Sequence, residues 1–171
     1  MTATANAANA AASAAAGASS AVAPSAIIIG CDHAAVGLKN IIVDYLRSIE
    51  IDVNDVGTHT LESVDYPDIG NQVAGAVSDG NFQRGILLCG TGLGMSMVAN
   101  KHPHVRAALC NDLFSAQLSR LHNDANILVM GGRLIGDVLA IEIVKAWLNT
   151  PFEGGRHQGR LNKFAPPRGA V

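Results

Sequence analysis

From Ala26 onward, the sequence alternates short apolar runs with segments of helical length. This alternation is the signature of repeated βαβ units, in which each crossover returns the chain parallel to the preceding strand. Strands are expected at residues 26–31, 51–56, 85–89, 106–110 and 126–130. Helices are expected at residues 36–49, 67–79, 95–100, 113–122 and 136–149. Right-handed crossovers then predict an α/β fold, a Rossmann-like three-layer αβα sandwich with a five-stranded parallel sheet.

Length and composition predict a single domain. With 171 residues, of which 49% are hydrophobic and 15% charged, the chain is long enough for one well-buried core and too short for two large ones. Residues 1–25 are Ala-rich and carry no charged side chain, so we expect a disordered extension there. This segment lacks the basic start and bulky apolar centre of a secretory signal, and the arginines of a transit peptide. We expect the domain at residues 26–164 and a flexible tail at residues 165–171.

Charge and cysteine usage exclude several classes of function. A net charge of −2, with basic residues dispersed until the final stretch, argues against a nucleic-acid partner. No apolar run approaches the roughly 20 residues that span a bilayer, so no membrane partner is expected. Cys31, Cys89 and Cys110 are an odd number without a CxxC pair, which favours free thiols in a cytoplasmic, reducing setting. Because neither HExxH nor a zinc-like histidine spacing occurs, we expect no metal and no cofactor.

A thiol and three glycines follow the third expected strand, in the sequence CGTGLGMS. Gly90, Gly92 and Gly94 let the backbone turn sharply and expose successive N–H groups, which can hold a phosphate or a developing oxyanion. Cys89, beside these N–H groups, can act as a base or a nucleophile. One alternative is a buried cysteine before an ordinary turn. Another is a dinucleotide site, but Met95 occupies the place of its third glycine.

Polar residues also follow other strands, at the edge where parallel sheets bind ligands. Asp32 and His33 follow the first strand, where they can handle substrate hydroxyls, although Asp32 can equally cap the next helix. Arg133 follows the fifth strand. His122 and Asn123 precede that strand and so belong at the opposite edge. They can reach the site only through an irregular connection or from a neighbouring subunit.

The sequence EGGRHQGR near the C-terminus supplies further basic groups. Arg156 and Arg160, with His157 between them, match phosphate oxygens in charge and, for the guanidinium forks, in geometry. The alternative is a solvated basic tail. The pair Gly154 and Gly155 predicts a tight turn that positions these side chains.

Six blocks occur in order along the chain, and together they resemble the ribose-5-phosphate isomerase B family over about residues 26–163. They are GCDHAA, DYPD, CGTGLGMSMVANK, RAALCND, HNDANIL and EGGRHQGR. The resemblance implies reversible conversion of ribose 5-phosphate into ribulose 5-phosphate without a metal or organic cofactor. It also implies a homodimer or tetramer with the site shared between subunits. Galactose-6-phosphate or allose-6-phosphate isomerase is the nearest alternative, and a noncatalytic sugar-phosphate sensor is a second one.

The resemblance also implies roles for individual residues. Cys89 would remove the proton from C2, while Thr91 and the loop backbone would stabilise the enediolate and contact substrate, through Gly90, Gly92, Leu93 and Gly94. His122 would open the sugar ring, with Asp32 sharing in that step. His33, Tyr66 and Asn123 would hold the sugar. The phosphate would be bound by Arg133, Arg156, Arg160 and His33.

Three departures from the family pattern bear on these roles. One branch of the family has a glutamate base at the position of Met95 and lacks the cysteine, so this chain falls in the cysteine branch. Ala35 replaces a glycine that often follows the histidine. Gly159 stands where many members have a polar or basic residue, which is expected to change phosphate affinity only slightly.

Overall fold

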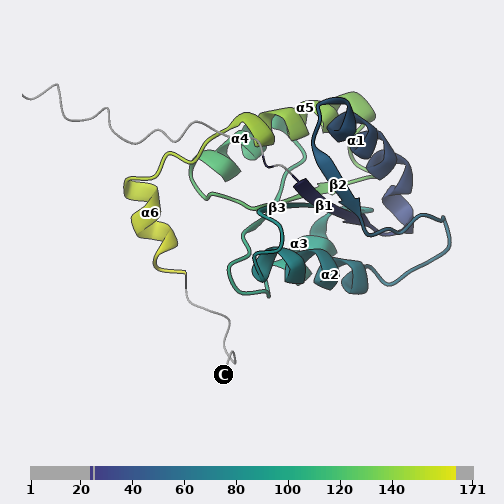
Figure 1. Ribbon diagram of the computed structural model, residues 1–171, viewed down its shortest axis with the longest axis horizontal. Coiled ribbons are helices and arrows are strands. Elements are labelled where there is room, and N and C mark those ends of the chain that lie inside the picture. The colour runs from purple at the N-terminus through teal and green to yellow at the C-terminus, as the bar shows by residue number, and fades with distance from the viewer. Residues whose placement is uncertain (1–23, 25, 165–171) are drawn as a thin grey trace, which may run out of the picture.

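The computed structural model describes residue 24 and residues 26–164 (Figure 1). The expected disordered extension and C-terminal tail lie outside the described residues, Pro24 apart. Five strands form one parallel sheet in the order β2-β1-β3-β5-β4. Their bounds are β1 (Ala26–Cys31), β2 (Asp52–Asp55), β3 (Arg84–Cys89), β4 (Ala107–Leu109) and β5 (Ile127–Gly131). The predicted five-stranded parallel sheet is therefore confirmed.

Helices cover both faces of the sheet, so the three-layer α/β sandwich is also confirmed (Figure 1). One face carries α1 (Val36–Ser48), α4 (Leu113–Leu121) and α5 (Asp137–Asn149), and the other carries α2 (Tyr66–Ser78) and α3 (Leu93–Ala99). A short 3-10 helix, η1 (His33–Ala35), precedes α1. Pro67 lies in the first turn of α2, where a missing N–H costs nothing. No helix in the described part of the chain is both long and apolar enough to cross a membrane.

The core has two halves because successive strand residues point to opposite faces. In β1, Ile27 and Ile29 pack with α1 and α5, whereas Ile28 packs with α2 on the other face. Every residue of β3 and of β5 is buried. Continuous apolar runs of this kind are what a strand covered by helices on both faces requires. The central strands thus end together at one edge, where the next residues form the candidate site.

Some element bounds differ from those expected. β2 and β4 are shorter, and α3 begins two residues earlier because Gly92, at φ +79°, turns the chain directly into the helix. An additional helix, α6 (Arg156–Leu161), was not predicted. Its six residues include Gly159, which weakens any local helix signal. Gly154 and Gly155 both adopt positive φ, as the expected tight turn requires. Figure 1 shows α6 set apart from the three layers.

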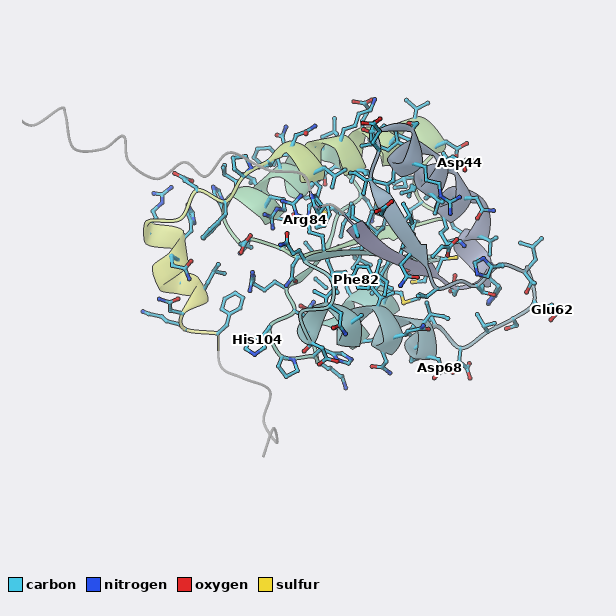
Figure 2. The ribbon with its side chains drawn as sticks, in the orientation of Figure 1. Asp44, Glu62, Asp68, Phe82, Arg84 and His104 are labelled. Atoms are coloured by element: carbon cyan, nitrogen blue, oxygen red, sulfur yellow. The ribbon has the colours of Figure 1, made fainter. Side chains whose placement is uncertain are left out.

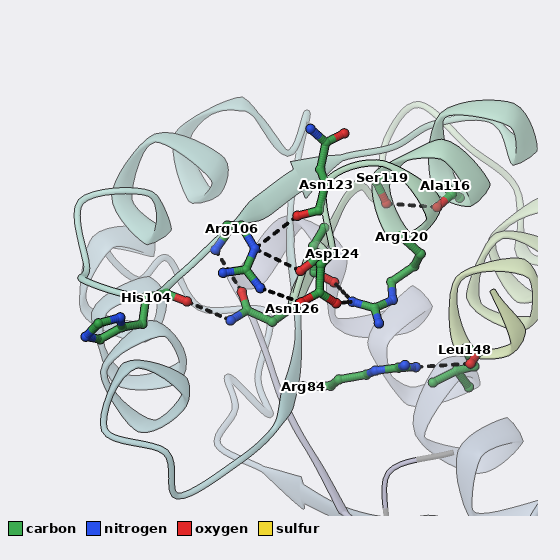
Figure 3. Close-up of polar contacts among 11 residues, drawn as sticks. Arg84, His104, Arg106, Ala116, Ser119, Arg120, Asn123, Asp124, Asn126 and Leu148 are labelled. Atoms are coloured by element: carbon green, nitrogen blue, oxygen red, sulfur yellow. Dashed lines mark hydrogen bonds and ion pairs between the residues drawn. The ribbon is translucent and has the colours of Figure 1, made fainter. Parts of the chain in front are cut away.

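An arginine network ties together the edge where the strands begin (Figure 3). Asp124 accepts a hydrogen bond from Arg106 Nη2 at 2.8 Å and forms an ion pair with Arg120 Nη1, also at 2.8 Å. Arg84 Nη1 donates to the carbonyl of Leu148 near the end of α5, at 3.1 Å. Figure 2 shows Arg84 within the body, whereas Glu62 projects on the loop between β2 and α2. Burial, and then the charge of Arg120, lower the pKa of Arg84 to about 10. The network therefore joins β3, β4, α4 and α5 at the edge opposite the candidate site.

Candidate active site

The centre of the candidate site is the thiol of Cys89, the last residue of β3. It is buried, and the backbone N–H of Gly92 donates to its Sγ at 3.1 Å. A donor aimed at sulfur stabilises a thiolate more than a neutral thiol. The next N–H, of Leu93, is held by Thr91 Oγ1 at 3.3 Å. The loop therefore presents backbone donors beside a group that can accept a proton.

Close packing explains two of the glycines in this loop. A Cβ on Gly92 would collide with the side chain of Leu109 and lie 3.1 Å from the carbonyl carbon of Met130. A Cβ on Gly94 would lie 2.6 Å from the ring of Tyr66. The Tyr66 ring thus packs directly on the loop backbone, and its expected contact with the sugar stays a prediction. Both positions need glycine because any side chain there would displace the neighbouring residues.

Arg133 brings a positive charge to the same loop. The segment after β5 is tied to it by the N–H of Gly132, which donates to the Cys89 carbonyl at 2.8 Å. The N–H of Arg133 donates to the Gly90 carbonyl at 3.0 Å. The Arg133 side chain lies against Gly90, with Nη1 3.8 Å from the position a Cβ would take there. An exposed guanidinium beside backbone N–H groups can bind an anion.

Asp32 and His33 lie where β1 ends. Asp32 is buried, and its N–H donates to the carbonyl of Leu88 in β3. Its Oδ1 caps η1 by accepting a hydrogen bond from the N–H of Ala34 at 2.9 Å. The capping alternative for Asp32 is therefore realised, and it uses one of the two carboxylate oxygens. His33 Nδ1 accepts from the N–H of Val64 at 3.3 Å, which orients its other nitrogen, Nε2, as the N–H donor. Both side chains are thus fixed beside the strand that ends in Cys89.

A second group of expected site residues lies around the end of α4 and the start of α6. His122 follows α4 and stacks on His157, with ring centroids 4.2 Å apart and planes at 9°. Glu153 Oε2 lies 3.2 Å from His157 Nε2 and 3.9 Å from His122 Nε2. Arg156 Nε donates to His157 Nε2 at 3.3 Å. Burial, reinforced by His122, lowers the pKa of His157 below its ordinary value of 6.5.

The structure therefore brings the expected residues together in two groups. Cys89, its loop, Asp32, His33, Tyr66 and Arg133 lie where strands end. The other group, His122, Asn123, Arg156 and Arg160, follows α4 or belongs to α6. In Figure 1, α6 lies on the left, whereas the loop after β2 extends to the right. In the described part of one chain, Cys89 ends β3 whereas His122 follows α4, so the two residues belong to opposite edges of the sheet.

Sequence reasoning missed Glu153 and the packing role of His157. Glu153 opens the motif EGGRHQGR, in which the arginines carry the stronger chemical signal. Its N–H donates to the Leu121 carbonyl at 3.0 Å, a contact between segments 32 residues apart in sequence. Local pattern does not encode such a contact, although Glu153 stands four residues before His157 in the sequence.

Comparison with known proteins gives a consistent result over nearly all described residues. The model of the ribose/galactose isomerase family matches residues 27–164. Ribose-5-phosphate isomerase B of Escherichia coli is 50% identical over 135 residues, covering 79% of this chain and 91% of that protein. D-erythrulose-4-phosphate isomerase of Pectobacterium atrosepticum is 48% identical over 139 residues, covering 81% and 91%.

A solved structure agrees with the sequence relatives. Ribose-5-phosphate isomerase B of Clostridium thermocellum has a TM-score of 0.80 to this chain at 52% identity, covering 81% of this chain and 93% of that one. The five-stranded parallel sheet flanked by helices agrees with this relationship. On the sequence match and the shared fold together, this chain belongs to the ribose/galactose isomerase family.

Proposed function

We propose that this protein interconverts ribose 5-phosphate and ribulose 5-phosphate, in the cytoplasm and within the non-oxidative pentose phosphate pathway. The observation that carries the proposal is the N–H of Gly92 directed at the Cys89 sulfur, 3.1 Å away. The relatives named above as ribose-5-phosphate isomerase B support this substrate. Aldose–ketose isomerisation needs a base and an oxyanion site close together, and this loop supplies both.

The proton transfer can be written for the open-chain aldose. The Cys89 thiolate takes the proton from C2, the electron pair of that C–H bond forms a C1=C2 double bond, and the carbonyl oxygen on C1 becomes the enediolate oxygen. Backbone N–H groups of the loop, with Thr91, stabilise that charge. The Cys89 thiol then returns a proton to C1 as the O2 hydroxyl proton moves to O1, leaving a ketone at C2. The atoms and charges balance without any external reductant or oxidant.

Ring opening and phosphate binding require the second group of residues. In the proposed homodimer, His122 of the partner subunit opens the furanose and Asn123 of the partner subunit holds the sugar. Arg156 of the partner subunit and Arg160 of the partner subunit bind the phosphate with Arg133 and His33 of this chain. The position of α6, set apart from the three layers in Figure 1, supports this exchange. An obligatory dimer follows, because one chain would hold only half of each site.

A second candidate substrate comes from the relative named D-erythrulose-4-phosphate isomerase, which is 48% identical. Its chemistry is the same aldose–ketose proton transfer on a shorter sugar. Galactose 6-phosphate and allose 6-phosphate are alternative substrates with a longer carbon chain. A noncatalytic sensor would bind such sugar phosphates without turnover.

The test is turnover in EDTA on purified protein, with ribose 5-phosphate, erythrulose 4-phosphate and allose 6-phosphate in parallel. We expect ribose 5-phosphate to give the highest kcat/KM. Higher kcat/KM on another sugar would reassign the substrate, and ligand-dependent thermal stabilisation without turnover would indicate the sensor.

Cys89→Ala is the matched variant for the base assignment. We expect kcat to fall at least about a hundredfold, because general-base catalysis typically contributes 10²–10⁴ and no other thiol faces the loop in the described residues. Binding of ribose 5-phosphate should be retained, as measured by calorimetry on the inactive variant. Cys110→Ala is the control, since that buried thiol packs in the core on the face covered by α1, α4 and α5. A fully active Cys89→Ala enzyme would exclude Cys89 as the base.

A further inference from the structure

His122, Glu153 and His157 form a compact set of metal-ligating side chains outside the Cys89 loop. One ligand atom from each residue lies within 4.8 Å of the other two. The set combines the end of α4, the segment after α5 and the first turn of α6. Two imidazoles and one carboxylate are the protein ligands of several open zinc sites, in which water fills the fourth position.

The separations suit a small divalent cation. Zinc bonds of about 2.1 Å place tetrahedral ligands about 3.4 Å apart. Here Glu153 Oε2 lies 3.2 Å from His157 Nε2 and 3.9 Å from His122 Nε2. The two rings are stacked, so the cation requires them to splay until it lies near both ring planes. The His122 side chain is 34% exposed and can turn, while His157, at 3%, is the fixed anchor.

Arg156 is the group that competes with a cation. Its Nε donates to His157 Nε2 at 3.3 Å, and this long hydrogen bond must break before that nitrogen can bind a metal. The positive charge nearby also weakens cation binding. Exposure of Glu153, at 51%, gives access from solvent. These contacts favour reversible binding over a permanently held ion.

We propose that His122, Glu153 and His157 bind a divalent cation of the zinc class, and that its binding blocks isomerase turnover. The cation would take up the imidazole nitrogen that His122 needs for proton transfer to the sugar ring oxygen. This consequence rests on the proposed function, whereas metal binding itself does not. The site is inhibitory, so it agrees with a reaction that proceeds in EDTA.

The experiment uses full-length protein first freed of metal with EDTA and then dialysed. Turnover of ribose 5-phosphate without metal is measured first, which tests the proposed function separately. Co²⁺ is then titrated into Cys89→Ala protein, so that the active-site thiol cannot bind it, and visible absorption of four-coordinate cobalt is recorded. Zn²⁺ inhibition is measured on protein that retains Cys89. We expect an intense cobalt spectrum, and zinc inhibition that EDTA reverses.

Glu153→Gln is the decisive variant, because glutamine keeps the shape and loses the anionic ligand. In the Cys89→Ala background it should weaken cobalt binding at least about tenfold, and alone it should raise the zinc concentration for half-inhibition by a similar factor. His102→Ala is the control, since this half-buried histidine bonds to Asn71 outside the set, and it should retain full zinc sensitivity. An active enzyme without a cobalt spectrum, or zinc inhibition that Glu153→Gln leaves unchanged, would overturn the proposal.

Discussion

Single residues in this protein act through their immediate backbone surroundings. Cys89 is a candidate base because the N–H of Gly92 points at its sulfur. That N–H is directed at the sulfur because Gly92 adopts φ +79°. A left-handed residue costs an L side chain about 1–2 kcal/mol, which glycine avoids. The same loop needs close approach as well as this conformation, since Leu109 and Met130 leave no room for a Cβ.

Gly92→Ala should therefore be more harmful than conformational strain alone predicts. We expect a loss of about 3 kcal/mol of unfolding free energy from strain plus overpacking, and at least about a tenfold fall in kcat. Gly80→Ala is the matched control, because Gly80 has φ +78° with nothing within 4 Å of its Cβ position. It should lose only about 1 kcal/mol and keep its kcat. Urea unfolding and steady-state kinetics measure both, and equal effects on stability would contradict the packing argument.

The buried thiol of Cys31 makes stability depend on alkaline pH. Burial is the main cause that raises its pKa from 9.0 to about 12, with the charge of Lys39 opposing the shift. The native thiol stays protonated where the unfolded thiol ionises, so its contribution to stability is complete below pH 9.0 and is lost as pH rises toward 12.

Comparison of the protein with Cys31→Ala isolates this effect from other titrating groups. Between about pH 8 and about pH 10.5, the unmodified protein should lose on the order of 1 kcal/mol more unfolding free energy than Cys31→Ala. Urea unfolding at both pH values measures the difference. Parallel pH profiles for the two proteins would show that Cys31 does not contribute.

At the scale of elements, the edge where strands begin is held by charged hydrogen bonds rather than by apolar packing alone. Arg120 is buried and faces Asp124, and Arg84 and Arg120 flank the ring of Trp147 at 5.2 and 5.9 Å. Asp124 also adopts φ +45°, a conformation that Asp and Asn tolerate better than most residues. One carboxylate therefore compensates arginines from two different elements.

Asp124→Ala should destabilise the fold by about 3 kcal/mol, because it leaves the buried Arg120 without its anionic partner. This figure is at the low end for buried pairs since the Asp124 side chain is 34% exposed. Asp124→Asn keeps the local backbone preference and should cost about 1 kcal/mol. Glu142→Ala, in an exposed pair with Lys145, is the control and should change stability by less than about 0.5 kcal/mol. Urea midpoints rank the three variants. An Asp124→Ala protein as stable as the unmodified protein would show that the network does not contribute to stability.

At the scale of the whole molecule, the described chain places two groups of candidate site residues at different edges of the sheet. Cys89 lies where β3 ends, and His122 lies where α4 ends, before β5 begins. In a βαβ crossover these ends belong to opposite edges. In the proposed dimer, the thiol group of one subunit therefore faces the histidine and arginines of the other.

Mixing two inactive variants tests this arrangement. Cys89→Ala and His122→Ala homodimers should each lack most activity, because each variant removes one required side chain from both sites of the dimer. After subunit exchange, half of the dimers are mixed and each has one intact site, so activity should recover to about one quarter of the unmodified level. Size-exclusion chromatography verifies that dimers persist. No recovery after verified exchange would mean that each site is built from a single chain.

How far the sequence could lead depended on how local each signal was. Strand and helix positions, the turn at Gly154 and Gly155, and the thiol beside the glycine loop depend on near neighbours in the chain, so pattern was sufficient to predict them. α6 was not predicted because a six-residue helix that contains glycine is stabilised by its tertiary contacts rather than by its own helix propensity.

The sequence by itself determined the α/β class, the five parallel strands and the chemical groups available at the strand ends. It did so because the spacing of apolar residues, the turn residues and the family motifs are local features of the sequence. Only the tertiary structure decided that the Tyr66 ring packs on Gly94, and that His122, Glu153 and His157 meet. It also decided that His122 stands apart from Cys89 in one chain. These are contacts between segments far apart in sequence, and their geometry depends on how whole layers pack, which no local pattern specifies.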